Sequence, residues 1–545
     1  MVITMASYQK SEIKISVRNI IEFIMRSGDL ESGFIGSNRA VEGTYAHQKV
    51  QKSRQKEEYV YQTEVHFSHS AEYDKFILSI SGRADGIIHK GDRIIIDEIK
   101  STGKSLESID ENYNPLHWGQ VMLYAYFYIL EKKMDKIEVQ LTYFQLESEQ
   151  TKEFVRKYSR QELEEFFDEI VARYLYWADY KYTWNKQRNS AIEELDFPFD
   201  SYRKGQRQLA VSVYKSILDN KKLYAQAPTG IGKTISTIFP SIKAMGEKGF
   251  EKIFYLTART VTRQVAEEGL QLLYSNNLRL KSITLTAKEK ICFQDKTECH
   301  PELCPYARGH YDRVNDALKA IVDREDLITR DIVEKYAEEY KVCPFEFSLD
   351  LTLWADMVIC DYNYLFDPRV GLKRFFSDDG GDYIFLVDEA HNLIDRAREM
   401  YSADLYLDEF IYLKKVLKEK KGLLNTGYKE EVFYKFLAYL DKLITLMSSY
   451  QQKLSKENDY IQKEEPLEYQ SILNGFINKA EELLILNQKV IDPGNKFDSN
   501  ISFNDKFNNK KNHNNNNYNN NDDDKNDSNN TSNNQESAKN NNNGV

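Results

Sequence analysis

The sequence predicts an α/β protein with more than one domain, and three features of the chain predict this class. The first 190 residues alternate helical stretches with short β-branched runs bounded by turn residues. From Lys221 the pattern becomes strand, glycine-rich loop, helix and strand, which is typical of a doubly wound parallel sheet. After Asn392 the pattern is almost entirely helical up to Leu486.

Length and composition narrow the class of protein. The chain has 545 residues and a formal net charge of −11, with 41% hydrophobic and 29% charged residues. These values exclude a collagen-like, mucin-like or wholly disordered chain. No stretch approaches the roughly 18 apolar residues of a membrane span, so we expect no membrane partner and no signal peptide. The acidic balance argues against a non-specific nucleic-acid coat, but it allows an enzyme with a local basic channel.

The same patterns suggest where the chain divides. We expect one domain over residues 1–190, a second over 195–395, a helical segment over 396–495 and a tail over 496–545. The first boundary lies near Asn189–Asp200, where a helical stretch rich in aromatic residues gives way to a polar turn. From Lys496 the chain is mostly Asn, and so little apolar surface cannot offset the entropy lost on ordering. We therefore expect the tail to be disordered.

In the first block we expect three helices and four short strands, and three of the strands are expected to form a meander. The helices are expected at Val17–Met25, Gly43–Arg54 and His117–Glu131. The strands are expected at Phe76–Gly82, Gly86–His89, Arg93–Ile99 and Lys136–Leu146.

Two carboxylates and a lysine lie on adjacent strands of this meander. Glu98 and Lys100 are two residues apart, so their side chains leave the same face of a strand, and Asp85 can reach that face. Converging carboxylates bind a hard divalent cation such as Mg²⁺ or Mn²⁺. Such an ion activates water and neutralises charge on a phosphodiester, while a nearby lysine stabilises the transition state. His47, on the preceding helix, can complete the metal shell.

Each of these residues also has a purely structural explanation when it is taken alone. An aspartate followed by ExK on two strands arises by chance, and a single helix histidine such as His47 is most often a surface residue. Gln120 and Tyr124 lie one turn apart on a helix, where they can contact DNA or brace the site.

Taken together and in this order, the histidine, the aspartate, the ExK pair and the QxxxY pair resemble the RecB-type branch of the PD-(D/E)xK nucleases. The resemblance covers roughly residues 1–190. It implies that the metal ligands are His47, Asp85 and Glu98, that the catalytic lysine is Lys100, and that Gln120 and Tyr124 support them. Asp97 lies on the opposite strand face. We therefore expect it at most to support the metal ligands through other residues and not to bind the metal itself. Some nucleases of this branch carry a four-cysteine iron–sulfur cluster, and this block contains no cysteine.

A second group of motifs predicts a nucleotide site. The apolar run Leu223–Ala227 leads into a loop with the sequence APTGIGKT, in which alanine replaces the first glycine of the strict pattern. Backbone N–H groups of such a loop, here around Gly230 and Gly232, cradle phosphates at a helix N-terminus. Lys233 is placed to reach the β- and γ-phosphates, and Thr234 to hold Mg²⁺.

A DEAH sequence at Asp388–His391 follows a hydrophobic run and completes the ATP motifs. We expect Asp388 to hold Mg²⁺, Glu389 to act as general base on the attacking water, and His391 to couple the nucleotide state to DNA. Upstream, YRKGQ ending at Gln206 resembles a Q-motif, whose glutamine recognises adenine. The ligand expected at this site is ATP with Mg²⁺.

Cysteines are few and clustered. The chain has five, too few for a disulfide framework. Four thiolates can hold Zn²⁺ or an iron–sulfur cluster, and the absence of paired CxxC spacing modestly favours the cluster. Cys360, in an apolar run, is expected to be a core residue. The four that lie between the two ATP motifs, within residues 285–350, are Cys292, Cys299, Cys304 and Cys343.

Cysteines in this position, followed by CPFE at Cys343 and ADMVICDYNY at residues 355–364, resemble the XPD/DinG family of superfamily 2 DNA helicases. The resemblance covers about residues 195–495. It implies a RecA-like lobe, a [4Fe–4S] cluster on the four cysteines, and a helical arch after the DEAH box. It also implies single-stranded or forked DNA as the track, 5′→3′ translocation, and DNA-backbone contacts from Thr257 and Arg259. A nuclease fused to such a helicase resembles a bacterial DinG-like subfamily, so we expect a cytoplasmic, nucleoid-associated protein in DNA repair or replication.

The resemblance ends where the second helicase lobe of the family would follow. That lobe supplies an arginine finger, worth about 10³–10⁵ in rate in other NTPases, and we find no second α/β block. We therefore expect ATP binding with poor turnover and little unwinding by this chain alone. A second chain that supplies the lobe is a candidate partner.

Three functions remain open. The first is an ATP-dependent DNA helicase joined to a metal-dependent nuclease. The second is a single-strand DNA nuclease whose ATP-binding lobe regulates it or tethers it to DNA. The third is a non-catalytic fragment that binds DNA and ATP.

Overall fold

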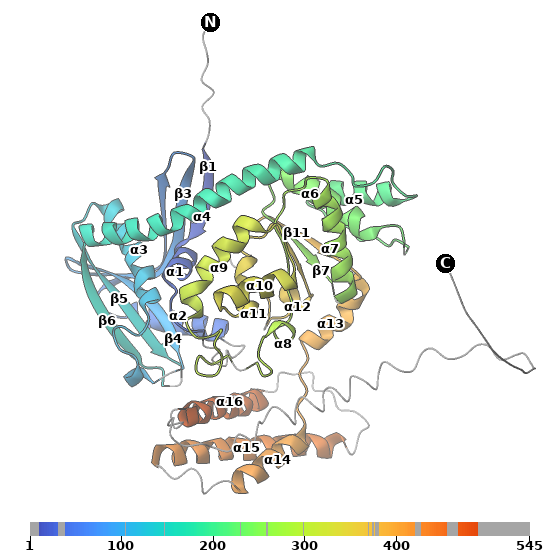
Figure 1. The fold of residues 1–545 in the computed structure, drawn as a ribbon. Coiled ribbons are helices and arrows are strands. Elements are labelled where there is room, and N and C mark those ends of the chain that lie inside the picture. Colours follow the sequence, from blue (N-terminus) through green and yellow to red (C-terminus); the bar gives the residue numbers. More distant parts are fainter. Residues whose placement is uncertain are drawn as a thin grey trace, which may run out of the picture. The chain divides into compact units, whose positions relative to one another are not determined.

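The computed structural model divides the chain into two compact units, Met1–Asp404 and Leu405–Val545, which are described one at a time (Figure 1). The tail expected over residues 496–545 and the side chain of Arg259 lie outside the described residues. The residues that the structure describes are 10–30, 39–103, 105–146, 148–228, 230–257, 260–297, 299–368, 370–372, 375–376, 381–419, 427–454 and 467–488.

The first sheet of the first unit is mixed and has six strands. Its order is β1-β3-β4-β5-β6, and β2 pairs with the other side of β3. β1 runs parallel to β3 and β4 parallel to β5, whereas the other neighbours are antiparallel. The strands are β1 (Ser11–Ser16), β2 (Val60–Glu72), β3 (Phe76–Lys90), β4 (Arg93–Thr102), β5 (Lys136–Gln145) and β6 (Thr151–Ser159).

The meander expected in this block is present, but its first two strands are one. Phe76–Gly82 and Gly86–His89 both belong to β3, which β2 borders along its length. Gly82 and Gly86 lie within this continuous strand and form no turn. Their lack of a side chain leaves space for aromatic rings. A Cβ on Gly82 would stand 2.8 Å from the hydroxyl of Tyr124, and one on Gly86 would overlap the ring of Tyr61. The strand expected at Lys136–Leu146 is confirmed as β5.

The three expected helices are confirmed. Ser16 caps the first, since its hydroxyl accepts a hydrogen bond from the Asn19 amide at 3.1 Å. Asn114 caps the third, which begins with a proline. The next helix begins with a capping box between Ser159 and Glu162. The helices of this block are α1 (Val17–Met25), α2 (Arg39–Arg54), the 3-10 turn η1 (Leu106–Ser108), α3 (Pro115–Lys132) and α4 (Arg160–Glu194).

The second sheet is parallel throughout, as expected for a doubly wound domain. Its order is β11-β7-β10-β8-β9. The three inner strands are fully buried because helices cover both faces. The strands are β7 (Lys252–Leu256), β8 (Ser282–Thr284), β9 (Leu327–Ile328), β10 (Met357–Cys360) and β11 (Tyr383–Val387).

Helices α6 and α7 pack on one face of this sheet, and α9, α10 and α11 pack on the other (Figure 1). The helices around the sheet are α5 (Gln206–Leu218), α6 (Lys233–Lys248), α7 (Thr260–Ser275), α8 (Lys288–Ile291), α9 (His310–Arg324), α10 (Arg330–Tyr340), α11 (Pro344–Leu351), α12 (Asn363–Phe366), the 3-10 turn η3 (Ala390–Asn392) and α13 (Leu393–Met400).

The prediction of a strand over Leu223–Ala227 is wrong. This run joins no ladder in the part of the chain that the structure describes, and its residues are largely exposed, Tyr224 to 90%. Apolar composition alone does not make a strand, because the backbone groups of a strand need a neighbour in register. β11, at the end of the sheet, is not paired with this run.

Helix α4 joins the two sheets into one packed unit. It runs on to Glu194, so it crosses from the first block into the second. Trp184 Nε1 and Arg188 Nη1 donate to the carboxylate of Asp356 at 2.8 and 2.7 Å, just before β10. One apolar cluster takes side chains from both blocks, including the rings of Trp177 and Trp354, 4.3 Å apart. The two expected domains therefore share a core.

The part of the second unit that the structure describes is mostly helical, as expected. The ring of Phe436 on its central helix stacks on Phe476 at 5.0 Å, next to the buried Leu483. None of the helices described in either unit is long and apolar enough to span a membrane. The helices of the second unit are α14 (Leu407–Glu419), α15 (Gly427–Leu454) and α16 (Leu467–Gln488).

The buried pair of Arg188 and Asp356 yields a prediction about stability. Arg188→Met leaves the Asp356 carboxylate buried without its cation, so we expect the free energy of unfolding to fall by about 3–5 kcal/mol. Urea denaturation monitored by circular dichroism measures it. Lys186→Met, at an exposed position of the same helix, is the control and is expected to change stability by less than about 0.5 kcal/mol. Equal effects of the two substitutions would contradict the assigned role of the pair.

Candidate active sites

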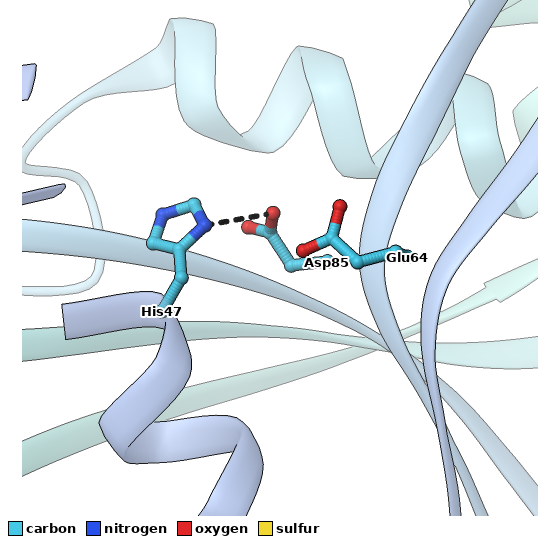
Figure 2. A group of neighbouring side chains, drawn as sticks. All are labelled: His47, Glu64 and Asp85. Atoms are coloured by element: carbon cyan, nitrogen blue, oxygen red, sulfur yellow. Dashed lines mark ion pairs between the residues drawn. The ribbon is translucent and has the colours of Figure 1, made fainter. Parts of the chain in front are cut away.

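Three side chains from three elements of the first sheet converge on one point (Figure 2). His47 points from α2 toward Asp85 of β3, and its Nδ1 lies 3.2 Å from Asp85 Oδ1. Glu64 of β2 points to the same place, and one ligand atom from each residue lies within 4.8 Å of the others. A histidine nitrogen and two carboxylate oxygens are a donor set for a divalent cation.

Glu64 is a candidate ligand that the sequence motifs missed. The strand register pairs Thr63 with Gly86 and Val65 with Ala84, which places Glu64 opposite Asp85. Its φ of 54° lies in the left-handed region, which costs a residue with a side chain of order 1 kcal/mol and is concentrated at functional sites. A signal in the sequence would have required the pairing of β2 with β3, and β2 was not expected.

Glu98 and Lys100 leave the same face of β4, as expected, and Lys100 also contacts helix α3. Lys100 Nζ donates to Glu98 Oε1 at 2.8 Å and to Gln120 Oε1, on α3, at 2.7 Å. The second oxygen of Glu98, Oε2, is buried, and no group in the described chain hydrogen-bonds to it. An unpartnered buried carboxylate oxygen is costly unless a cation or water binds it. Glu98 therefore offers a free ligand oxygen.

Burial and crowding of charge control ionisation in this group. Burial, together with the charge of Asp85, raises the pKa of Glu98 to about 7. The charge of Lys100 and its hydrogen bond lower this pKa but do not outweigh burial. Burial lowers the pKa of His47, but the hydrogen bond and charge of Asp85 outweigh burial and leave that pKa raised. Because the pKa of the Glu98 carboxyl rises on folding, this group stabilises the folded chain at low pH. That stabilisation is lost as the pH rises through about 7.

These residues fit a divalent cation. His47, Glu64, Asp85 and Glu98 would hold it, since their donors are nitrogen and carboxylate oxygen and one of them lacks any partner. Tyr124 stands beside them: burial raises its pKa, and so do the charges of Glu98 and Asp85. The phenol therefore stays protonated and can donate a hydrogen bond.

The glycine loop and the Q-motif lie against each other in the second sheet's domain. Gly230 and Gly232 have φ values of 80° and 83°, which glycine adopts without strain. A Cβ on Gly232 would stand 2.5 Å from Gln206 Nε2, so only glycine allows this approach. Gln206 Oε1 accepts from the Arg203 amide at 2.9 Å, and the Arg203 guanidinium donates to the Gly230 carbonyl at 2.6 Å.

The two halves of the expected nucleotide site meet at the start of α6. Lys233 Nζ lies 3.0 Å from Glu389 Oε1. Asp388 Oδ2 accepts from the hydroxyl of Tyr255 at 3.1 Å, and Tyr255 also interacts with Thr234. Lys233 thus pairs with Glu389, the carboxylate that the motif places beside the attacking water. A phosphate that binds Lys233 would have to break this ion pair.

Two further expected residues lie outside this contact. His391 is largely exposed and its Nδ1 lies 3.3 Å from Glu389 Oε2. Thr257 is buried at the end of β7, where its hydroxyl contacts that of Thr262.

The four clustered cysteines form no disulfide in the described part of the chain and lie in one region of the fold. Cys304 and Cys343 are buried in the same apolar cluster. Lys288 interacts with Cys299 and Cys343; burial lowers its pKa, but these thiols and Glu346 raise it overall. Cys292 follows α8, the short helix that carries Lys288. Burial raises the pKa of Cys343 to about 12, so this thiol needs a metal to become a thiolate.

No three of the four cysteines bring their sulfurs within 4.8 Å of one another in the described structure. Four thiols can hold either zinc or an iron–sulfur cluster once they are deprotonated. Cys360 is fully buried in the core, as expected.

Comparison with known families matches both parts of the chain. Residues 18–211 match the PD-(D/E)XK nuclease superfamily, and residues 263–410 match DEAD_2. The chain joins a PD-(D/E)XK nuclease region to a DEAD_2 helicase region. The nuclease region contains all the convergent carboxylates described above, and the DEAD_2 region contains the four cysteines and the DEAH sequence.

Among curated proteins, the chain is similar to regulator of telomere elongation helicase 1 homologs. That of Drosophila ananassae is 24% identical over 258 residues, which is 36% of this chain and 25% of the relative. That of Caenorhabditis elegans is 24% identical over 274 residues, 42% of this chain and 27% of the relative. The chain thus spans about a quarter of the length of these relatives, in a region that covers one helicase lobe.

Among solved structures, "XPD_Helicase" matches with 18% identity and a TM-score of 0.33, covering 53% of this chain and 48% of that one. "Truncated XPD" matches with 18% identity and a TM-score of 0.32, covering 52% of this chain and 82% of that one.

A buried polar network lies behind the nuclease ligands. Asp97 faces away from Glu98, as expected, and Thr142 Oγ1 donates to its Oδ1 at 2.6 Å. Arg54 Nε, on the last turn of α2, lies 3.7 Å from its Oδ2. Burial raises the pKa of Asp97 to about 6 in spite of these partners. Since His47 lies two turns before Arg54, this pair fixes α2 against β4 and sets the position of the histidine.

The contact between Arg54 and Asp97 can be tested through metal affinity. Arg54→Met releases the end of α2, so we expect the affinity of the nuclease region for Mn²⁺ to fall roughly 10–100-fold, as when residues behind metal ligands are removed. Isothermal titration at neutral pH measures it. Lys52→Met, exposed on the same helix, is expected to leave the affinity unchanged. If Arg54→Met binds Mn²⁺ as tightly as Lys52→Met, the arginine does not position the site.

Proposed function

We propose that the chain is a DNA-processing enzyme whose nuclease region cleaves a DNA phosphodiester with a divalent metal ion. The observation that carries this proposal is the buried Glu98 oxygen without a partner, beside a lysine and opposite the histidine and aspartate. A structural cluster would satisfy that oxygen within the protein. A metal site leaves it free for the ion.

The side chains divide the chemistry between them. His47, Asp85 and Glu98, with Glu64, would hold the ion, Mg²⁺ or Mn²⁺, which when bound supplies Lewis-acid activation of water and neutralises phosphate charge. Lys100 is held between Glu98 and Gln120, so its ammonium group stays at the site and can donate to a phosphate oxygen as charge develops. Tyr124 remains protonated and can donate to the DNA backbone.

The lysine provides the test of nuclease function. Lys100→Ala is expected to lower the cleavage rate of a labelled single-stranded oligonucleotide in Mn²⁺ by roughly 10²-fold or more, because its donor is lost from the transition state. Lys136→Ala, an exposed lysine on the adjacent strand β5, is the matched control and is expected to cleave normally.

Two results would count against the nuclease assignment. Cleavage that survives Lys100→Ala at the rate of the control would remove the lysine from the reaction. Cleavage that persists in excess EDTA would remove the metal ion from it.

The helicase region supports a second activity, ATP binding. Lys233 lies at the N-terminus of α6 and pairs with Glu389, and Gln206 packs on the glycine loop. We propose that Gly230, Gly232, Lys233 and Thr234 bind the phosphates of ATP with Mg²⁺, that Asp388 holds the ion, and that Gln206 contacts the base. In full, we propose an XPD/DinG-type motor that moves 5′→3′ on single-stranded or forked DNA.

The cysteines complete the proposed cofactors. We assign a [4Fe–4S] cluster to Cys292, Cys299, Cys304 and Cys343, supported by their common region of the fold and by the cation of Lys288 beside Cys299 and Cys343. Without an iron centre the Cys343 thiol stays protonated, since its pKa is about 12.

ATP binding and turnover can be separated by one substitution. Lys233→Ala removes the cation expected on the phosphates, so we expect binding of a fluorescent ATP analogue to weaken at least 10-fold, whereas exposed Lys248→Ala on the same helix is expected to bind normally. The chain alone is expected to hydrolyse ATP slowly. Rapid hydrolysis stimulated by single-stranded DNA would contradict this and show that the catalytic arginine is already supplied. Unchanged binding by Lys233→Ala would refute the nucleotide site.

A further inference from the structure

The segment that follows α1, Arg26–Leu30, belongs to the nuclease region but runs along the cysteine-bearing part of the helicase region. Backbone and side-chain groups of the two segments alternate as partners, so the contact has a fixed register. The hydrogen bonds are Leu30 N to Ala307 O at 2.8 Å, Tyr311 N to Gly28 O at 3.0 Å, Gly28 N to Asp312 Oδ1 at 2.8 Å and Gly309 N to Asp29 Oδ1 at 2.6 Å.

Leu30 forms part of the wall around the cysteines. Its side chain is 6% exposed, and it packs in one apolar cluster with Cys304, Ala307 and Cys343. Two of the four proposed cluster ligands therefore lie against a residue of the nuclease region. An apolar wall excludes water, which controls how readily an iron–sulfur cluster is attacked or lost.

Arg26 fixes the other end of the segment. Its Nη1 donates to Asp350 Oδ2 at 2.6 Å, and both side chains are nearly buried. Asp350 lies on α11, the helix that begins immediately after Cys343. Arg26 also donates to Asn315, on α9, through Nε at 3.1 Å. A paired buried charge of this kind is costly to break, so the segment is held at both ends.

The same segment leads directly into the nuclease site. Met25, the last residue of α1, lies so close to Gly119 of α3 that a Cβ there would stand 2.6 Å from its sulfur. The next residue of α3, Gln120, accepts the hydrogen bond from Lys100. Two side-chain carbons of Ile21, also on α1, would stand 3.1 Å from the same Cβ, so α1 packs directly on the helix that carries Gln120.

We propose that Leu30 is a positioning residue for the cysteine site, that Arg26 ties the end of α1 to the helices around that site, and that an iron–sulfur cluster bound there holds α1 in place and so orders Gln120 and Lys100. The nuclease site then depends on the state of a cluster whose ligands all lie in the helicase region. This inference rests on the proposed cluster ligation, so its tests measure iron and backbone order as well as activity.

The first test measures retention of iron. Leu30→Ala and Leu30→Asp open the wall, so we expect iron to be lost to a chelator several-fold faster than from the unsubstituted chain. Leu30→Met keeps the wall apolar and is expected to retain iron normally, as is Val155→Asp at an exposed site on β6. If Leu30→Ala, the milder variant, loses iron no faster than Val155→Asp, the wall assignment is overturned. A full-length chain purified without oxygen that holds no iron would overturn the cluster ligation itself.

The second test measures order in α1 by hydrogen exchange. Removal of iron is expected to speed exchange of the α1 amides several-fold, with β5 and β6 unchanged as an internal reference. Cys343→Ser is expected to reproduce this change, and Cys360→Ala, a buried cysteine outside the set, is not. In Arg26→Met, iron is retained but exchange in α1 is expected to be fast whether iron is present or not. Exchange in α1 that does not respond to iron in the unsubstituted chain would overturn the coupling, even where the cluster and the nuclease are both active.

Discussion

The first unit depends on one buried carboxylate. Asp356 stands just before β10, in the middle of the parallel sheet, and it accepts hydrogen bonds from the indole of Trp184, the guanidinium of Arg188 and the amide of Lys281. Two of these donors come from α4, which begins in the nuclease region. Around this point lies Lys252, whose ammonium donates to the Thr352 carbonyl and whose pKa burial lowers to about 7. The charge of Asp356 is thus satisfied only when the helix of one region reaches the sheet of the other.

The candidate nuclease site is less completely paired. Asp85, Glu98 and Glu64 lie near the cations of Lys100 and Arg83 and near His47, and one oxygen, Glu98 Oε2, has no hydrogen-bond partner in the described chain. Behind this face, both carboxylate oxygens of Asp97 accept hydrogen bonds. Rigid support behind and incomplete pairing in front are what a site that binds a cation requires, because ordering the ligands in advance lowers the cost of binding.

Local signals in the sequence predicted the helices α1, α2 and α3 and the strands β3, β4 and β5. α1, α3 and β5 have clear periodicity and caps, so they follow from the residues alone. β2 and β6 were not expected, since polar residues occupy much of both strands and only their pairing with β3 and β5 makes them strands. The prediction of a strand at Leu223–Ala227 is wrong for the converse reason, because an apolar run without a neighbouring strand does not form a strand.

Motifs identified His47, Asp85, Glu98 and Lys100, which the fold brings to one face, but they could not identify Glu64. Its place opposite Asp85 depends on a register and a left-handed backbone that only the assembled sheet determines. The contact of Leu30 with the cysteines is likewise invisible in sequence, since it joins segments far apart in the chain.

One feature of the parallel sheet has a consequence for handling the protein. β11 is the last strand on its side in the described structure, and the ring of Phe385 on it is 43% exposed. A straight, apolar strand with free backbone donors and acceptors is a template on which another chain can add. Concentrated solutions of this protein should therefore lose material to self-association through that edge, and a charged residue at Phe385 would reduce this loss.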